Sequence, residues 1–208
     1  KTIMHGLSAM SAPLYFLEGL GRGQNSYIWI NNFILLKSIK HMLWILLLIP
    51  IGVAVWYFYP DNPLPNGIAI DKIVVYKSKR KMEVYADDNL LKTYTIALGK
   101  NPMGHKQFEG DNRTPEGAYT INARNPNSDY HKNLGVSYPD ETDKANAGKL
   151  GKSPGGHIKI HGLRNGRGYI GKFHRLKDWT AGCIAVTNAE IDELYTAVKT
   201  DAIIDIRP

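Results

Sequence analysis

The strongest hydrophobic pattern along the chain is an uncharged apolar run of 18 residues at positions 42–59. At a rise of about 1.5 Å per residue, a helix of this length nearly crosses the hydrocarbon core of a bilayer. Lys37 and Lys40 precede the run, and its aromatic residues lie toward its ends, where amphipathic rings favour the headgroup region. We therefore predict one membrane-spanning helix over residues 42–59, with a cytoplasmic N-terminus and an exported C-terminal part.

Two other interpretations of this run are less favoured. A cleaved signal peptide has a shorter apolar stretch followed by small residues, whereas residues 57–60 here are Tyr-Phe-Tyr-Pro. A buried core helix would carry a polar outer face, and nothing polar marks one in the run. The sequence thus favours an uncleaved anchor.

The segments that flank the predicted anchor carry less pattern. Residues 1–36 show no sustained hydrophobic period, and the chain begins with Lys1. One interpretation is a trimmed or wrongly placed start, with Met42 as an alternative start, so residues 1–41 are treated as a tail without an assigned function. Residues 60–69 contain three prolines and predict a stiff, extended linker.

Beyond the linker, the hydrophobic period changes to that of short strands. Segments rich in β-branched and aromatic residues, separated by turn residues, predict strands at residues 72–76, 82–86, 91–98, 118–121 and 202–206. Turns are expected at 87–89 and 113–117, where Asp, Asn, Pro and Gly gather. The polar residues 122–156 predict a long loop, which is either functional or disordered.

Residues 156–162 alternate strictly between two faces. Ile158 and Ile160 face one side of the expected strand, whereas His157, Lys159 and His161 face the other. The apolar side is expected to point into the core, so that three basic side chains share the opposite face.

One amphipathic helix is predicted near the C-terminus. Thr187 and Glu190 have the spacing of a capping box. The apolar residues that follow lie at the intervals of one helix face, at Ile191, Leu194, Tyr195 and Val198. The pattern therefore predicts a mainly β domain over residues 70–208, with one main helix that packs on the sheet.

Net charge adds little to this picture. The formal charge of +7 comes from 26 Lys and Arg against 19 Asp and Glu, and it is dispersed along the chain. The densest basic cluster, residues 77–81, is expected to be a solvated strand end or turn. Nucleic-acid binding needs basic residues gathered on one element, so nucleic acid is not an expected partner.

The single cysteine, Cys183, excludes an intrachain disulfide and a multi-cysteine metal site. It lies 22 residues after His161 and directly after Gly182. A free thiol has a pKa of about 8.5, so a neighbouring imidazolium is expected to lower that pKa and produce the reactive thiolate. Gly182 allows close approach of the backbone to a substrate, and N–H groups around it can stabilise an oxyanion.

Three segments together resemble a known family. Residues 160–162 are Ile-His-Gly, residues 178–184 are Asp-Trp-Thr-Ala-Gly-Cys-Ile, and residues 113–121 are Arg-Thr-Pro-Glu-Gly-Ala-Tyr-Thr-Ile. In this order they resemble the signature of the L,D-transpeptidase catalytic domain family, also called YkuD-like. The resemblance runs from about residue 70 to the C-terminus and implies an L,D-transpeptidase-like β-sandwich or barrel.

The resemblance also implies roles for individual residues. Cys183 matches the catalytic nucleophile and His161 the catalytic histidine. Gly182 matches the glycine whose backbone neighbourhood supports the oxyanion, and Thr180 matches the Ser or Thr of the same motif. No acidic third member can be assigned from the sequence.

The chain departs from the usual family pattern at three points. Ala181 stands where a histidine often precedes Gly-Cys, and Ala185 stands where an arginine often follows Cys-Ile. The spacing from histidine to cysteine is also longer than usual. These departures resemble a subgroup with an Asp-Trp-Thr-x-Gly-Cys motif, some members of which are hydrolytic.

Further basic residues are candidates for the cleft. His174 is a candidate to replace the histidine missing at Ala181, and the other candidate cleft residues are His157, Lys159, Arg164 and Arg167. His105 and His131 are expected to be solvated loop residues. Zinc binding by Cys183 and the histidines at 157, 161 and 174 is disfavoured, because no short two-ligand spacing beyond one i, i+4 pair on a strand supports it. No metal or cofactor is expected.

The resemblance implies acyl transfer on peptidoglycan stem peptides through a Cys183 thioester. The expected location is the bacterial inner membrane, with a single membrane pass and the catalytic domain on the periplasmic side. Two alternatives stay open. One is a murein peptide amidase or carboxypeptidase that uses water as the acceptor at the same site, and the other is a non-catalytic wall-binding membrane protein with a buried cysteine.

Overall fold

The computed structural model describes residues 19–59 and 62–208, with side chains from residue 33 onward. Residues 1–18 of the predicted tail and residues 60–61 of the predicted linker lie outside the described residues. The chain divides into two compact units, Lys1–Phe58 and Tyr59–Pro208.

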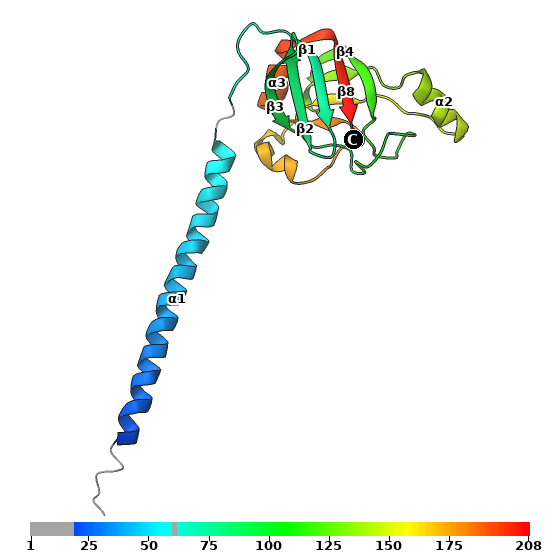
Figure 1. Cartoon of the computed structure of the whole chain (residues 1–208). Helices are drawn as coiled ribbons and strands as arrows, with labels where there is room; N and C mark the ends of the chain where they lie inside the picture. The colour runs from blue at the N-terminus through cyan, green and yellow to red at the C-terminus, as the bar shows by residue number, and fades with distance from the viewer. Residues whose placement is uncertain (1–18, 60–61) are drawn as a thin grey trace, which may run out of the picture. The chain divides into compact units, whose positions relative to one another are not determined.

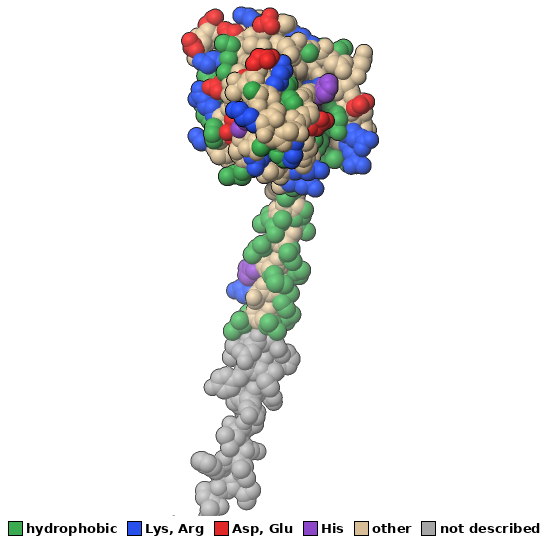
Figure 2. All heavy atoms as spheres, turned by 90° about the vertical axis from the view of Figure 1, so that its right-hand side faces the viewer, with side chains coloured by type: hydrophobic (Ala, Val, Ile, Leu, Met, Phe, Trp, Pro, Cys, Tyr) green, Lys and Arg blue, Asp and Glu red, His purple; other side chains and the backbone are tan. Residues whose placement is uncertain are grey.

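The described residues of the N-terminal unit form helix α1 (Gly19–Phe58), which begins 23 residues before the predicted anchor. The segment Phe33–Phe58 is long and apolar enough to cross a membrane. Its apolar side chains are exposed, and hydrophobic side chains cover it in Figure 2. The tail predicted over residues 1–41 is therefore partly helical. Its sequence gives no periodic signal there, because only a helix that packs on a core needs an amphipathic period.

The C-terminal unit is built on one curled sheet of eight strands in the order β3-β2-β1-β8-β4-β5-β6-β7 (Figure 1). Neighbours are antiparallel except for the pairs β1–β8 and β6–β7, which are parallel. The mainly β prediction is confirmed. The strands are β1 (Ile70–Tyr76), β2 (Lys81–Ala86), β3 (Asn89–Thr95), β4 (Gly117–Ser128), β5 (His131–Val136), β6 (Lys159–His161), β7 (Ile184–Ala185) and β8 (Val198–Arg207).

The two ends of this strand order meet, which gives the sheet a half-barrel form. Ala97, just after β3, donates a backbone hydrogen bond to Ala185 of β7 at 3.0 Å, and Ala185 donates one back at 2.8 Å. The sheet closes around a core of apolar side chains from alternating strand positions, among them Ile73, Val75, Met82, Ile121, Leu134, Ile160, Ile184 and Ile204.

Helix α3 (Asn188–Ala197) has the predicted capping box, in which the Thr187 and Glu190 side chains each accept the other residue's backbone N–H. Ile191 and Leu194 are fully buried in the core. Val198 is also buried, but it begins β8 instead of ending the helix. Its apolar side chain fits either element, so the sequence pattern alone does not separate them.

The prediction of a long loop over residues 122–156 is wrong. Strand β4 continues to Ser128, β5 returns antiparallel to it, and α2 (Glu141–Lys149) follows with a capping box from Asp140. Most side chains of β4 beyond Ile121 are exposed, and most of α2 is exposed too. Such elements show no apolar period, so their composition resembles that of a loop.

The basic cluster forms a turn over residues 77–80 and the first residue of β2, Lys81, but the prediction that it is solvated is wrong for two of its members. Lys77 is buried, and its Nζ donates to the carbonyls of Gly104 and Thr114 at 2.7 and 2.8 Å and to Glu116 Oε1 at 2.9 Å. Arg80 is half-buried and pairs with Asp178. Two cations of the cluster thus stabilise the tertiary structure around the following loops.

Candidate active site

Strands β6 and β7 bring His161 and Cys183 to neighbouring positions. The strands run parallel with His161 opposite Ala185, and Cys183 directly precedes β7. Both residues line a cavity of about 540 Å³, here termed the nucleophile cavity. The rest of its lining consists of Lys100, Asn125, Asn127, Ser128, Asp129, Tyr130, Asn133, His157, Lys159, Trp179, Thr180 and Ala181.

The loop that carries the cysteine, residues 178–183, is fixed at its start by a network of hydrogen bonds. Asp178 Oδ2 accepts from Arg80 Nε at 3.0 Å and Nη2 at 2.8 Å, and its Oδ1 accepts the Leu98 N–H at 2.8 Å. The Thr180 N–H donates to the Leu98 carbonyl, and the Lys100 N–H donates to the Thr180 carbonyl. The chain after β3 therefore holds this loop from both sides.

Only glycine fits at position 182. Its φ is +135°, and a Cβ atom there would lie 2.7 Å from the Arg113 carbonyl oxygen. Thr180 Oγ1 accepts the Gly182 N–H at 3.1 Å and donates to the Cys183 carbonyl at 2.7 Å. The Gly182 N–H is therefore engaged, whereas the Cys183 N–H has no acceptor among the described residues.

The hydrogen bond of His161 defines its tautomer. Its Nδ1 lies 2.7 Å from the Gly162 carbonyl oxygen. A carbonyl only accepts, so Nδ1 carries the proton and Nε2 of the neutral ring holds a lone pair. The backbone carbonyl thus orients the imidazole in the way that a carboxylate does in a catalytic triad.

The expected thiolate–imidazolium pair is not the resting state. Burial lowers the pKa of His161 to about 4. The charge of Lys159 also lowers this pKa, whereas the hydrogen bond to Gly162 opposes the shift. Burial also raises the pKa of the Cys183 thiol, and the Lys159 N–H and the charges of Lys159 and Lys106 only partly oppose that. The thiol donates a 3.5 Å hydrogen bond to the His157 carbonyl. Both groups are therefore neutral, because the site disfavours charge.

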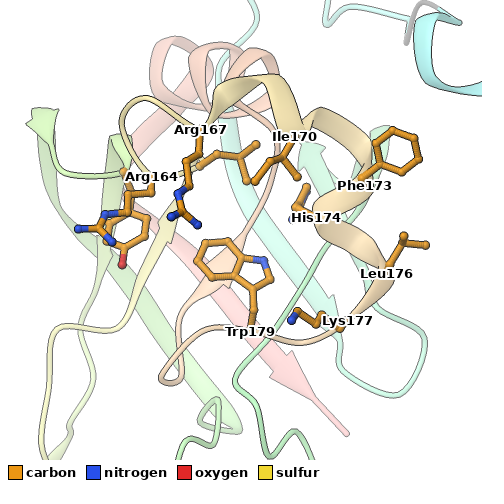
Figure 3. Close-up of a pocket in the computed structure, with 10 residues that line it drawn as sticks. Arg164, Arg167, Ile170, Phe173, His174, Leu176, Lys177 and Trp179 are labelled. Carbon is orange, nitrogen blue, oxygen red and sulfur yellow. The ribbon is translucent and has the colours of Figure 1, made fainter. Parts of the chain in front are cut away.

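An aromatic wall separates the nucleophile cavity from a second one. The His161 ring lies 4.7 Å from Tyr130 and 5.6 Å from Trp179 between ring centroids. Tyr130 and Trp179 also line a cavity of about 630 Å³, here termed the basic cavity, which Figure 3 shows. Most of its other lining residues lie on or beside the 3-10 segment η2 (Gly168–Leu176).

The candidate cleft residues are divided between the two cavities. Thr180 is buried and braces the cysteine loop, while His157 and Lys159 line the nucleophile cavity. His174 and Arg164 line the basic cavity instead. His174 therefore does not occupy the place left open at Ala181, although its ring lies beside Trp179, with ring centroids 6.5 Å apart.

The prediction that His105 and His131 are solvated is wrong. His105 Nε2 lies 2.9 Å from the Asp143 carboxylate, and its Nδ1 accepts the Glu116 N–H. His131 Nε2 lies 2.9 Å from Asp192 of α3. Both rings are half-buried, because the loops assumed to be open to solvent fold back on the sheet.

Several residues of the site escaped the sequence prediction. Arg80 is 98 residues away from Asp178, and no local pattern connects them. Tyr130 and the polar residues of the β4–β5 hairpin looked like parts of a loop. The Asn-Pro-Asn-Ser-Asp sequence at 125–129 was the available signal, since two strands joined at a cluster of turn residues form a hairpin.

Comparisons of the sequence with known proteins indicate one family. A family model described as the L,D-transpeptidase catalytic domain matches residues 70–206. An Escherichia coli K12 protein named "Putative L,D-transpeptidase YafK" is 30% identical over 132 residues, which cover 61% of this chain and 46% of YafK.

Solved structures support the same fold. The helical cell shape determining protein Pgp2 from Campylobacter jejuni is 26% identical, with a TM-score of 0.51 over 66% of this chain and 49% of Pgp2. A mutant of the same protein gives 25% identity and a TM-score of 0.52 over 70% of this chain. The chain spans about half the length of these relatives.

Proposed function

This chain belongs to the L,D-transpeptidase catalytic domain family, and from that premise we propose that it catalyses acyl transfer on peptidoglycan stem peptides through Cys183. One observation carries the proposal. The hydrogen bond from His161 Nδ1 to the Gly162 carbonyl leaves the Nε2 lone pair available in the cavity that holds the thiol. A nucleophile and an oriented base in one cavity are the minimum for covalent acyl transfer.

The first step is acylation of the cysteine. His161 Nε2 accepts the thiol proton as the sulfur attacks the peptide carbonyl carbon, so no stable thiolate is needed beforehand. The C–N bond then breaks, the leaving amine takes the proton from His161, and a thioester stays on Cys183. Because both groups are neutral at rest, charge develops only when substrate is bound.

The oxyanion needs a donor, and the Cys183 N–H is the one that the loop leaves available. The Gly182 N–H is bonded to Thr180 Oγ1 at 3.1 Å and holds the shape of the loop instead. A donor fixed by such a network does not have to reorient during the reaction. Gly182 thereby supports the oxyanion through backbone geometry.

We further propose that α1 anchors the enzyme in the bacterial inner membrane, with the catalytic unit on the outer, periplasmic side. Lys37 and Lys40 lie in the N-terminal part of the apolar segment Phe33–Phe58, and basic residues at this end support a cytoplasmic N-terminus. Peptidoglycan, the proposed substrate, lies outside the cytoplasm, and this orientation places the C-terminal unit on the same side of the membrane.

Incubation of the full chain in detergent with disaccharide tetrapeptides tests the function. Mass analysis should detect an acyl adduct on Cys183, followed by cross-linked dimers or amine-exchange products. Cys183→Ala should form neither, and His161→Gln should slow acylation by at least about 100-fold, as loss of a general base does. Only shortened peptides without transfer products would establish the hydrolytic alternative, and a thiol that never becomes acylated would contradict an enzymatic role.

A further inference from the structure

The segment around η2, residues 163–177, concentrates the positive charge of the chain. It contains five Lys or Arg residues and no Asp or Glu, so it carries +5 of the chain's formal charge of +7. Arg164, Arg167 and Lys177 are exposed, and none of them forms an ion pair with a residue that the structure describes. They line the basic cavity and are here termed its rim cations. Such a concentration of cations at the surface favours an anionic partner.

The same segment exposes apolar side chains and buries a polar one. Tyr169 is 76% exposed and Leu176 is 77% exposed, whereas His174 is only 6% exposed. In Figure 3, Phe173 and Leu176 extend away from Trp179. A surface element normally has the reverse arrangement, because apolar side chains are stabilised when they leave water. Large exposed apolar side chains grouped on one element indicate an interaction surface.

These two features belong to one surface of the C-terminal unit. We term it the η2 surface, and it consists of Tyr169, Phe173, Leu176 and the three rim cations. Aromatic and leucine side chains beside several cations, without an acidic residue, are typical of elements that lie in the interface of a bilayer. An acidic protein partner would account for the cations, but it would not require the apolar side chains.

The η2 segment is held at the start of the C-terminal unit. Lys172 Nζ donates a 2.7 Å hydrogen bond to the backbone carbonyl of Tyr59. Tyr59 is the first residue of this unit, and it directly follows Phe58, the last residue of α1. The apolar segment that we propose as the membrane anchor also ends at Phe58. Chain connectivity therefore keeps η2 close to the point at which the chain leaves the membrane.

We propose that the η2 surface rests on the outer face of the membrane and binds the phosphate headgroups of anionic phospholipids. The inference rests on the proposed membrane anchor. Tyr169, Phe173 and Leu176 enter the boundary between headgroups and acyl chains, where a ring with a polar hydroxyl such as that of Tyr169 is favoured. The rim cations stay at the level of the phosphates.

A weak contact is sufficient for this docking, because α1 would already hold the C-terminal unit at the bilayer. Two linked binding elements act at a high effective concentration, so the second needs little affinity of its own. Each basic residue near an anionic surface strengthens binding by about fivefold, so the three rim cations together contribute roughly 100-fold. The contact adds a second attachment to the anchor and limits rotation of the C-terminal unit above the membrane.

The test uses the full chain in vesicles, with a fluorescent label on the η2 surface. Cys183→Ala removes the native thiol, and Leu176→Cys then supplies one site for the dye. The vesicles contain phosphatidylcholine, phosphatidylglycerol and a lipid with a nitroxide quencher at headgroup level. Leu90→Cys is the matched control, since Leu90 is an exposed leucine of β3. We expect quenching at position 176 to be at least about threefold that at position 90.

Charge variants of the labelled protein locate the contact. Arg164→Glu with Arg167→Glu should weaken docking by at least about 25-fold, so that quenching at position 176 falls to the level at position 90. Vesicles without phosphatidylglycerol should produce the same fall without any change in the protein. Lys199→Glu, at an exposed position of β8, is the control and should keep the original quenching.

The outcomes separate this inference from the proposed function. Equal quenching at positions 176 and 90, or quenching that survives the double substitution, would overturn the docking alone. A label at position 176 that is shielded from aqueous iodide but not quenched by the nitroxide lipid would assign the surface to another part of the protein or a second copy, and would also overturn it. A chain that does not float with the vesicles would overturn both the anchor and the docking. Acylation of Cys183 in detergent needs no bilayer, so that assay is independent of all these results.

Discussion

The two cavities that share Trp179 differ in how the polar groups around them are satisfied. On the nucleophile side, Asp178 and Thr180 are fully engaged with Arg80, Leu98 and their own loop. On the side of the basic cavity, the cations of the rim are unpaired and His174 has no partner among the described residues. Satisfied groups hold a fixed geometry, whereas unsatisfied groups are available to a ligand. The fold thus separates the groups that position Cys183 from the groups that are available to bind a ligand.

The largest effect is expected from Gly182→Ala. The new Cβ would lie 2.7 Å from the Arg113 carbonyl oxygen, at a φ of +135° that side chains rarely adopt. Strain and overpacking together should lower the free energy of unfolding by about 4 kcal/mol. Urea denaturation measures the change. Gly148→Ala on exposed α2, where no atom lies within 4 Å of the new Cβ, is the control and should raise stability by about 0.5 kcal/mol. Similar free energies of unfolding for the two variants would contradict the close packing of Gly182 against the Arg113 carbonyl.

The next largest effect concerns pH on the side of the basic cavity. Burial, with smaller contributions from Arg175 and His161, lowers the pKa of His174 to about 4. Between an unfolded pKa near 6.5 and this folded value, the unfolded chain binds more protons, so stability is present above pH 7 and is lost as pH falls. The free energy of unfolding of the wild-type protein should fall between pH 7 and pH 4, in part because His174 must become protonated. The variant His174→Phe has no such group, so its fall should be smaller by roughly 3 kcal/mol. Urea midpoints across this range measure it, and an unchanged pH slope would show that His174 is not held neutral.

A smaller loss is expected from Asp178→Asn on the nucleophile side. The amide keeps the oxygen that accepts the Leu98 N–H but loses the charge that pairs with Arg80. For this half-buried pair we expect a loss of about 2 kcal/mol and slower acylation of Cys183. Asp205→Asn, which breaks the exposed pair with Arg207, should cost less than about 0.5 kcal/mol. If Cys183 is acylated at the wild-type rate in both variants, the contacts of Asp178 with Arg80 and Leu98 do not position Cys183.

The smallest effect on stability should come from the rim of the basic cavity. Arg167→Glu and Lys177→Glu alter cations that form no ion pairs among the described residues, so each should change the free energy of unfolding by less than about 0.5 kcal/mol. Thermal unfolding of each variant measures this. A loss of more than 1 kcal/mol would indicate a structural role for these cations, and the contrast between the two cavities would then disappear.

The elements that the sequence predicted correctly are those that pack on the core. Ile191 and Leu194 have helical spacing because α3 covers the core. The strand predicted over residues 156–162 is only partly correct, because β6 spans Lys159–His161 and His161, expected opposite the apolar face, is buried like Ile158 and Ile160. Helix α2 and the far end of β4 were missed because few of their side chains are buried. Periodicity reports burial on one face, so an element without a buried face has no detectable period.

The candidate site divides in the same way. Local motifs were sufficient to identify Cys183, His161 and Thr180 as candidates, since each lies in a short segment with a recognisable pattern. The neutral state of the Cys183–His161 pair was not predictable, because burial determines it and burial depends on the whole fold. The placement of His174 in a second cavity, which shares Trp179 with the nucleophile cavity, likewise depends on the tertiary structure.

The sequence by itself therefore determined the apolar helix, the mainly β C-terminal unit, and the cysteine and histidine that line one cavity. These features depend on residue type and local spacing, which a linear sequence records. Only the tertiary structure decided that Arg80 holds Asp178 across 98 residues, and that a backbone carbonyl orients His161. It also decided that His174 and the rim cations share a second cavity. Contacts between distant segments arise when the sheet closes, and no local pattern specifies them.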